Sequence, residues 1–370
     1  MAKISLIYVV PYLINSGPIN VLYNIVKHLD RTKFNPIIIT LYKNYAPAHD
    51  NKNLFEALGV EIFENSYSRL YVELHTKQIA MQLEEKYNAK DTIFHAHGYY
   101  PTLVLSKFKK AHTITTIHNI CDQDFRMTKG FLMGNFMSFM YKKALKNIDS
   151  CVAISDFMKD YYSKDQSLKL CTIYNGVSVQ LRKEGDTIAL KKELNLPINK
   201  KILLFPAGFT HGKNHKYLIE SVKTFKRNDF IILFAGQGIT EDECKQIVGD
   251  DSRFLFLGFQ MDLSKYWAIT DFMISPSVSE GLPMAVLEAL VQGIPCLLSD
   301  IPPHREIIER VFGSDSLCFS LTDEKDLLQR FENMLDSNFD REQVREKAST
   351  LYTSQVMATN YMSLYSSLLQ

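Results

Sequence analysis

The 370-residue chain lacks a long hydrophobic run, and this absence bears on membrane topology. The first apolar stretch lies at the N-terminus and the longest internal one covers residues 131–141. Both are shorter than the roughly 20 residues that an α-helix needs to cross a bilayer. The N-terminal run also lacks a small-residue cleavage site, so we expect it to form a first strand and not a signal peptide.

The chain also lacks an excess of charge and any closely spaced pair of cysteines. Its 42 basic and 41 acidic residues leave a net charge of +1, which does not favour a general nucleic-acid binder. No C-x-x-C pair or zinc-ligand spacing is present, so we expect reduced, buried thiols in a cytoplasmic protein. The six cysteines are Cys121, Cys151, Cys171, Cys244, Cys296 and Cys318.

What the chain does contain is an alternation of short apolar runs with helical patterns. Continuous apolar strands flanked by helices predict parallel sheets that are covered on both faces. The strand candidates fall into two series, 4–10, 36–42, 92–97, 112–118, 150–155 and 170–176, and then 201–208, 229–236, 253–258, 271–277 and 294–300.

These two series predict an α/β protein of two Rossmann-like, doubly wound domains that face a central cleft. The polar segment 179–200 contains no good strand, and we interpret it as the linker and entrance to the second domain. The domains are therefore expected at residues 1–178 and 179–352. A helical pattern over 353–370 is expected to pack on a domain surface.

The segment SEGLPMAVLE (279–288) contains two glutamates eight positions apart, and Gly-Leu-Pro directly follows the first of them. Pro283 suits the first position of a helix, which places Glu280 at the helix mouth and Glu288 on its second turn. The N–H groups of Gly281 and Leu282 are then free to bind an oxygen-rich ligand. One carboxylate beside these groups can hold a sugar hydroxyl, and the second can hold a vicinal diol such as a ribose. Alternatively, the two acids are a cap and a solvated helix residue.

The stretch 271–308 closely resembles the sugar-nucleotide motif of the retaining GT-B glycosyltransferases of family 4, also called glycosyltransferase group 1. The shared pattern is Glu280, seven residues, Glu288, and then Gly293-Ile294-Pro295. The resemblance implies that Glu280 and the N–H groups after it hold the transferred sugar, and that Glu288 holds the nucleotide ribose. It further implies that residues 353–370 cross back onto the N-terminal domain, which is then the acceptor side.

Three further segments resemble the same family and add donor-binding candidates. Gly17 in NSGPIN resembles the glycine loop near the donor phosphates, although Ser16 replaces a second glycine. Lys213 in AGFTHGKNHKYLIES resembles the lysine that clamps the diphosphate, although Phe209 stands near the place of the usual arginine. Gly236 belongs to a G-x-G close to the nucleotide. Without the resemblance, Gly17 is turn chemistry, Lys213 a solvated lysine, and Gly236 a weak signal for a dinucleotide fold.

Two histidines end predicted strands of the first domain. The resemblance implies that His118 faces the donor sugar, where it can accept a proton or hold a hydroxyl near neutral pH. His97 is a candidate for the acceptor side. Each is alternatively a structural histidine. The only D-x-D, at 122–124, lies outside the expected setting of a metal site, so we expect neither a metal nor any cofactor apart from the sugar-nucleotide substrate.

Residues 125–147 mix phenylalanine and methionine with five basic residues. Such a segment can lie on an anionic membrane surface, and the alternative is a core helix with a solvated basic face. The membrane interpretation predicts a lipid-linked acceptor and a cytoplasmic enzyme that contacts the membrane peripherally.

Together these features predict a retaining, metal-independent hexosyltransferase that uses a nucleoside-diphosphate sugar, with UDP as the expected nucleotide. The expected acceptor is a hydroxyl of a lipid-linked or surface glycan in bacterial polysaccharide or glycolipid synthesis. Two alternatives stay open, a sugar-nucleotide epimerase and a non-catalytic glycosyltransferase-like subunit.

Overall fold

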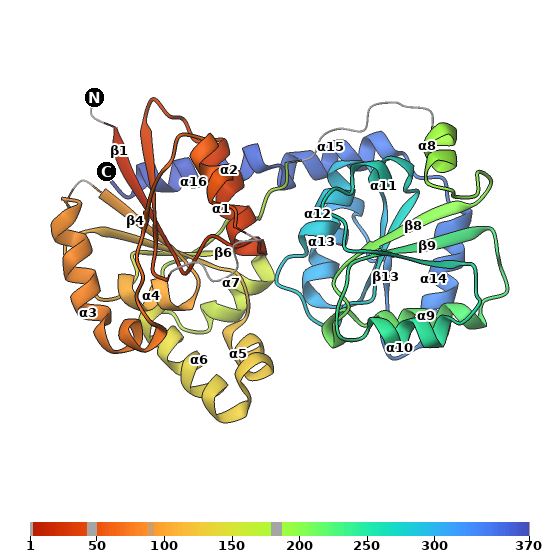
Figure 1. Cartoon of the computed structure of the whole chain (residues 1–370), viewed down its shortest axis with the longest axis horizontal. Helices are drawn as coiled ribbons and strands as arrows, with labels where there is room; N and C mark the ends of the chain where they lie inside the picture. The colour runs from red at the N-terminus through yellow and green to blue at the C-terminus, as the bar shows by residue number, and fades with distance from the viewer. Residues whose placement is uncertain (1–2, 43–49, 89, 91, 179–186, 370) are drawn as a thin grey trace. The chain divides into compact units, whose positions relative to one another are not determined.

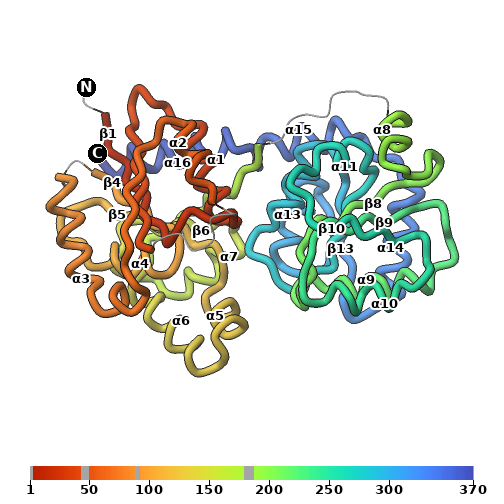
Figure 2. The backbone as a smooth tube through the Cα atoms, viewed as in Figure 1, coloured from red at the N-terminus to blue at the C-terminus, as the bar shows by residue number. Residues whose placement is uncertain are grey.

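The computed structural model describes residues 3–42, 50–88, 90, 92–178 and 187–369, and the chain divides into two compact units (Figures 1 and 2). Unit 1 contains residues 1–176 and 354–370, and unit 2 contains residues 177–353. The expected boundaries, 178/179 and 352/353, lie within two residues of these divisions.

Unit 1 is built on a seven-stranded, all-parallel sheet in the order β3-β2-β1-β4-β5-β6-β7. Its strands are β1 (Ile4–Val10), β2 (Phe34–Thr40), β3 (Glu61–Glu64), β4 (Thr92–His97), β5 (His112–Ile117), β6 (Ser150–Ala153) and β7 (Leu170–Thr172). Its helices are α1 (Gly17–Lys27), α2 (Lys52–Ala57), α3 (Arg69–Lys86), α4 (Tyr99–Leu105), α5 (Cys121–Lys129), α6 (Phe131–Leu145), α7 (Asp156–Ser163) and α16 (Ser354–Ser367).

Unit 2 is built on a six-stranded, all-parallel sheet in the order β10-β9-β8-β11-β12-β13. Its strands are β8 (Lys201–Pro206), β9 (Phe230–Ala235), β10 (Phe254–Gly258), β11 (Phe272–Ser275), β12 (Cys296–Ser299) and β13 (Cys318–Phe319). Its helices are α8 (Thr187–Glu193), α9 (His215–Thr224), α10 (Glu241–Val248), α11 (Ser264–Ile269), α12 (Met284–Val291), α13 (Pro302–Phe312), α14 (Glu324–Asp336) and α15 (Arg341–Tyr352), with a 3₁₀ turn η3 (His211–Lys213).

Both sheets have the strand order of a Rossmann fold, which confirms the predicted fold class. In unit 2 the chain winds outward from β8 in one direction and from β11 in the other. In unit 1 the reversal lies between β1 and β4. Ligands of open α/β sheets bind outside the carboxyl ends of the strands at such a reversal, so each unit has one preferred position for a site.

Most of the predicted strands are buried, because a strand covered on both faces must be apolar throughout, and the partly buried edge strands β7 and β10 were predicted as well. All six residues of β9 are buried, as are the last five of β1. The strands that the sequence did not predict, β3 and β13, lie at sheet edges and are four and two residues long. β3 begins and ends with an exposed glutamate and β13 has only two residues, so neither provides the continuous apolar run that identified the other strands.

The segment interpreted as a linker is partly helical. Residues 179–186 lie outside the described residues, and α8 follows directly. The ammonium group of the buried Lys191 donates to the carbonyl of Lys200 at 2.8 Å, which ties this helix to the start of β8.

The last helix, α16, belongs to the core of unit 1. Its Tyr365 hydroxyl lies 3.2 Å from the Tyr8 hydroxyl and 2.9 Å from Nδ1 of His95. Its Tyr361 hydroxyl lies 2.8 Å from Oγ1 of Thr116. These fully buried polar groups satisfy one another, which fixes α16 against β1, β4 and β5.

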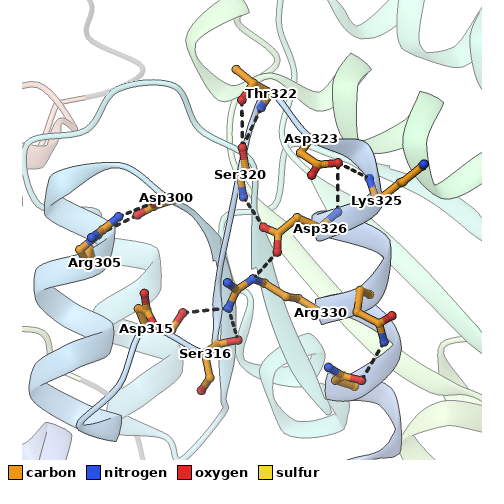
Figure 3. Close-up of polar contacts among 12 residues, drawn as sticks. Asp300, Arg305, Asp315, Ser316, Ser320, Thr322, Asp323, Lys325, Asp326 and Arg330 are labelled. Atoms are coloured by element: carbon orange, nitrogen blue, oxygen red, sulfur yellow. Dashed lines mark hydrogen bonds and ion pairs between the residues drawn. The ribbon is translucent and has the colours of Figure 1, made fainter.

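The N-terminus of α14 is fixed by carboxylates in the edge region of unit 2 (Figure 3). Asp323 caps the helix by accepting from the N–H groups of Lys325 and Asp326. The Asp326 carboxylate then accepts from Ser320 N–H at 2.7 Å and from Arg330 at 2.8 Å. This network anchors the connection that follows β13.

All six cysteines lie in the described residues and all six thiols are free, with only Cys171 less than fully buried. No helix in the described part of the chain has both the length and the apolar character needed to cross a membrane.

Two glycines with nearly the same backbone conformation differ in the space around them, so we expect alanine substitution to lower stability by different amounts. Gly293 has φ of +75° and Gly313 has φ of +73°. A Cβ at Gly293 would lie 2.3 Å from the Arg341 carbonyl oxygen, whereas nothing lies within 4 Å of a Cβ at Gly313. We expect Gly313→Ala to lower the free energy of unfolding by about 1–2 kcal/mol through backbone strain alone. We expect Gly293→Ala to cost on the order of 3 kcal/mol or more, because overpacking adds to the strain.

Thermal and urea unfolding of the two variants beside the unmodified chain measure this difference. Equal losses for the two variants would show that α15 does not press against the turn after α12.

Candidate active site

Two of the predicted donor-binding residues meet at the strand-order reversal of unit 2. Lys213 ends the η3 turn after β8, and Glu280 lies in the loop after β11, 67 positions further along the chain. The Lys213 ammonium and the Glu280 carboxylate form a hydrogen-bonded ion pair. The two loops are also joined through the backbone, because Val278 N–H donates to the Gly212 carbonyl at 2.9 Å.

Local backbone chemistry sets the position of Lys213. Asn214 adopts a left-handed conformation with φ of +58°, which asparagine tolerates better than most residues, and it serves as the N-cap of α9. Lys213 therefore stands beside the positive end of a helix, where a cation is unfavourable without a nearby anion. Glu280 supplies that anion here, and its side chain is only 12% exposed. The arrangement suits a second anion, such as a phosphate, in the same place.

The helix that follows Glu280 begins later than the sequence predicted. α12 starts at Met284, and Pro283 is its N-cap and not its first helical residue. The prediction of Pro283 at the first position was therefore wrong, and its extended backbone lengthens the loop. Among the described residues, none accepts a hydrogen bond from the N–H groups of Gly281 or Leu282. Both donors are therefore available for a ligand beside Glu280.

Glu288 lies on the second turn of α12 and lines a cavity of about 550 Å³ in unit 2. The other lining residues come from the start of unit 2, the β10–α11 loop, α11 and the end of α12, and they are Ser178, Gln260, Met261, Asp262, Leu263, Ser264, Trp267 and Gln292. Burial raises the pKa of the Glu288 carboxyl to about 7. None of the described residues forms a hydrogen bond or ion pair with this carboxyl. Its oxygens are therefore available to a ligand in the cavity.

Phe209 is a core residue and does not stand at a ligand-facing position. Its side chain is fully buried, and its ring stacks on His215 with the centroids 4.0 Å apart. It also lies against Phe234 and Phe256. The buried ring offers no charged or polar group to a phosphate. The charge at the loop comes from Lys213.

Gly236 has a steric role in the same region. A Cβ at this position would lie 2.1 Å from the Ala207 carbonyl oxygen. A Cβ at Gly238 would lie 2.3 Å from the Phe209 carbonyl oxygen. The G-x-G therefore permits the loops after β8 and β9 to touch, which the sequence motif did not reveal.

His304 is a neighbour of this site that sequence reasoning did not select. Its imidazole is fully buried, and Nδ1 lies 3.0 Å from the Ser299 carbonyl oxygen, an acceptor that requires Nδ1 to carry the proton. The Ser299 hydroxyl donates to the Ser277 carbonyl at 2.5 Å, which links this turn to the loop that carries Glu280. Burial lowers the pKa of His304 to about 4, while the Glu280 charge raises it and the Lys213 charge lowers it. His304 lies in the segment IPPHREII, at the end of the stretch that resembles the family motif, and this position was its only signal in the sequence.

In unit 1 the structure brings together the two histidines that the sequence singled out. Nδ1 of His97 lies 3.0 Å from Nε2 of His118, at the carboxyl ends of β4 and β5. Burial lowers the pKa of His118 to about 4 and that of His97 well below its usual value. Both rings are therefore neutral at pH 7. The lowered pKa makes the His118 imidazole a weak base, while the neutral ring can still form hydrogen bonds with a hydroxyl group.

Gly17 is the first residue of α1, and its backbone is not left-handed. A Cβ at this position would have no neighbour within 4 Å. The described structure gives no steric reason for glycine here.

No group of three or more His, Cys, Asp or Glu that could hold a metal ion is found within the described ranges. In the D-x-D segment, Asp122 is paired with the ammonium of Lys142 and accepts from the Tyr161 hydroxyl.

Comparison with known proteins identifies the class to which this fold and site belong. The family model of the glycosyl transferases group 1 matches residues 186–350, and that of glycosyltransferase family 4 matches residues 16–181. The chain belongs to the group 1, family 4 glycosyltransferases, which have the GT-B fold.

Among individual proteins, the chain is similar to the O-antigen biosynthesis glycosyltransferase WclY of Escherichia coli. The two are 25% identical over 355 residues, which cover 90% of this chain and 94% of WclY. It is also similar to the Escherichia coli UDP-Gal:alpha-D-GlcNAc-diphosphoundecaprenol alpha-1,3-galactosyltransferase, with 27% identity over 48% of this chain and 47% of that enzyme. Among solved structures, Anabaena HepE in complex with UDP superposes with a TM-score of 0.81 at 14% identity, over 98% of this chain and 100% of that one.

The raised pKa of Glu288 predicts a pH-dependent cost to stability. An acid with a raised folded-state pKa binds its proton more tightly in the folded state. Its contribution is therefore unchanged below about pH 4.5 and becomes increasingly unfavourable as the pH rises toward 7. Glu288→Gln removes this cost, so we expect it to stabilise the ligand-free protein at pH 8, by at most about 3 kcal/mol, and to have little effect at pH 4.5.

Thermal unfolding at both pH values measures the effect, with Glu220→Gln on the exposed face of α9 as the control. A stabilisation by Glu288→Gln that does not change with pH would contradict the buried, partly protonated carboxyl.

Proposed function

We propose that this glycosyltransferase moves a hexose from a UDP-sugar to a hydroxyl of a lipid-linked or surface glycan, with retention of the anomeric configuration. The observation that carries the proposal is the ion pair of Lys213 and Glu280 at the strand-order reversal of unit 2, on the same unit as the cavity lined by Glu288. The fold favours a ligand site at this position, and these side chains offer groups for a phosphate, a sugar and a diol.

The donor occupies unit 2 in this proposal. The Lys213 ammonium and the N-terminus of α9 bind the diphosphate, which competes with Glu280 for Lys213. The Glu280 carboxylate and the N–H groups of Gly281 and Leu282 then bind sugar hydroxyls from opposite sides. Glu288 binds the ribose diol from the cavity wall. The name of the galactosyltransferase relative, which includes UDP-Gal, and the UDP complex of HepE support UDP as the nucleotide.

Transfer in this proposal depends on stabilising the leaving diphosphate. Charge develops on the diphosphate as the glycosidic bond breaks, and a positioned cation with helix N–H donors stabilises that charge. Lys213 supplies the cation, so the proposal includes no metal. Glu280 is paired with Lys213, and we assign it to sugar binding and not to nucleophilic attack. In this proposal the neutral His118 of unit 1 holds a hydroxyl of the donor sugar, and His97 is assigned to the acceptor side.

The acceptor in this proposal carries a lipid. WclY is named for O-antigen biosynthesis, and the galactosyltransferase relative is named for a diphosphoundecaprenol-linked substrate. We therefore place the protein in the cytoplasm, in peripheral contact with the membrane through residues 125–147.

The two alternatives make different predictions for the same protein. A sugar-nucleotide epimerase would release an epimer or a free sugar from the donor without an acceptor. A non-catalytic subunit would bind the donor without turnover over a range of acceptors.

Donor binding is tested by thermal shift with UDP, UDP-glucose, UDP-galactose, UDP-N-acetylglucosamine, GDP-mannose and ADP-glucose. A ligand at 100 times its dissociation constant adds about 2.7 kcal/mol of stability. We expect UDP and at least one UDP-sugar to raise the Tm of the unmodified chain. We expect Glu288→Ala to reduce that shift by weakening ribose binding, and Lys213→Ala to reduce it by weakening diphosphate binding.

Lys216→Ala is the matched control, because Lys216 lies on the same helix start but pairs with Glu243 on α10. Each shift is compared with the ligand-free Tm of the same variant, since removal of Lys213 leaves Glu280 without its partner. If no nucleotide stabilises the unmodified chain, or if Lys216→Ala loses the shift equally, the assigned donor site is wrong.

A further inference from the structure

The surface of unit 1 has an unusual concentration of exposed apolar side chains on the hairpin formed by α5 and α6. Six large apolar residues here are between 56% and 84% exposed, with Leu132 the most exposed. They are Met127, Phe131, Leu132, Met133, Phe136 and Phe139, and we call them the hairpin patch.

The inner face of α6 explains why the hairpin patch is not an incompletely packed core. This helix buries a separate set of residues, Gly134, Met137, Ser138, Tyr141, Ala144 and Leu145, against the rest of unit 1. The contact with α5 is close, because a Cβ at Gly134 would lie 2.6 Å from the Phe125 carbonyl oxygen. Figure 1 shows α5 and α6 as neighbouring helices, joined at Gly130. The helix is thus apolar on both faces, and only the inner face has a protein partner among the described residues.

The outer face of α6 changes character along its length. Leu132, Phe136 and Phe139 follow one another at helical spacing, and Lys143 continues the same face one turn later. An apolar face that ends in lysine places hydrocarbon and ammonium groups side by side. Lysine side chains at such a border extend their charge toward water and phosphate while their methylene groups stay in contact with the apolar surface.

Residues 125–147 carry only positive charge. They contain Arg126, Lys129, Lys142, Lys143 and Lys146, and no aspartate or glutamate. Lys142 pairs with Asp122, and Lys146 pairs with Asp165. Among the described residues, no carboxylate forms an ion pair with Arg126, Lys129 or Lys143. Lys129 and Lys143 are therefore available to an anionic surface. Arg126 donates to Asn135 Oδ1 at 2.6 Å and lies over the Phe131 ring, but its charge has no carboxylate partner in the described structure.

We propose that the hairpin patch inserts into the interfacial region of an anionic lipid bilayer, with Arg126, Lys129 and Lys143 in contact with lipid phosphates. Protein interfaces are depleted in lysine, whereas an apolar face bordered by lysines is typical of helices that lie on membranes. Basic residues near an anionic membrane add to the attraction between protein and lipid. The inference deepens the proposed function and rests on it. Insertion of the hairpin patch holds the acceptor-side unit at the membrane, where a lipid-linked glycan is found.

The test is flotation of the full chain with vesicles of phosphatidylcholine containing about 30% phosphatidylglycerol, compared with pure phosphatidylcholine vesicles. We expect the unmodified protein to float with the anionic vesicles and to lose most of its binding when salt rises from about 0.1 M to about 0.5 M. The variant Leu132→Ser/Phe136→Ser/Phe139→Ser is expected to bind at least tenfold more weakly. The variant Lys129→Gln/Lys143→Gln is expected to lose binding to the anionic vesicles and much of the salt dependence.

The matched control is Leu70→Ser/Leu74→Ser/Met81→Ser on α3, which removes three large apolar residues of the same unit that are 51% to 70% exposed. We expect this control to float like the unmodified chain. We also expect every variant to have the Tm of the unmodified chain, because the changed side chains are exposed. Absence of flotation, or equal binding by the hairpin and control variants, would overturn the proposal. Self-association that the triple hairpin variant abolishes, without vesicle binding, would instead assign the patch to a second copy of the chain.

Flotation requires neither donor nor turnover. A failure of membrane binding is therefore distinguishable from a failure of the donor-site assignment, which the nucleotide thermal shift tests separately.

Discussion

The backbone hydrogen bond from Val278 to Gly212 is the contact on which the proposed donor site depends. It joins the loop after β8 to the loop after β11, the two connections that flank the strand-order reversal of unit 2. With these loops in register, Lys213 reaches Glu280, and α12 begins where its second turn places Glu288 at the cavity. Gly236 is also needed for this arrangement of loops, because a Cβ there would clash with the Ala207 backbone and separate the neighbouring loops.

Burial shapes the electrostatics around this contact. Glu288, His118 and His304 all have pKa values displaced toward their neutral forms, because a buried charge without a partner is unfavourable. Lys213 and Glu280 instead form an ion pair with each other. The charged side chains at the reversal therefore form one ion pair. In the proposed function, a diphosphate separates this pair by competing with Glu280 for Lys213. The neutral groups around it are suited to hydrogen bonds with hydroxyls.

Unit 1 combines a buried, hydrogen-bonded polar network with an exposed apolar surface. Its core holds a fully satisfied polar network that includes Tyr8, His95 and Tyr365, and this network joins the last helix of the chain to the centre of the sheet. Beside it, His97 and His118 contact each other at the carboxyl ends of β4 and β5. Its outer surface instead exposes apolar side chains on the α5–α6 hairpin, where cations without an ion-pair partner among the described residues border them. The satisfied network around His95 is structural, whereas the exposed apolar and basic side chains of the hairpin are available to a partner.

The sequence by itself determined the parts of this protein that follow from local pattern. Buried parallel strands must be apolar throughout, so all eleven predicted strands exist, and the spacing of Glu280 and Glu288 around a helix start placed both acids correctly along the chain. The edge strand β3 lacks that pattern and was not predicted. Pro283 was assigned one position too far into its helix, because proline suits both the N-cap and the first turn. Only the tertiary structure decided that Phe209 is a core residue, that Gly236 lets two loops touch, and that His304 lies beside the Glu280 loop. These outcomes depend on contacts between residues distant in sequence, and no local pattern records which side chains such contacts will bury.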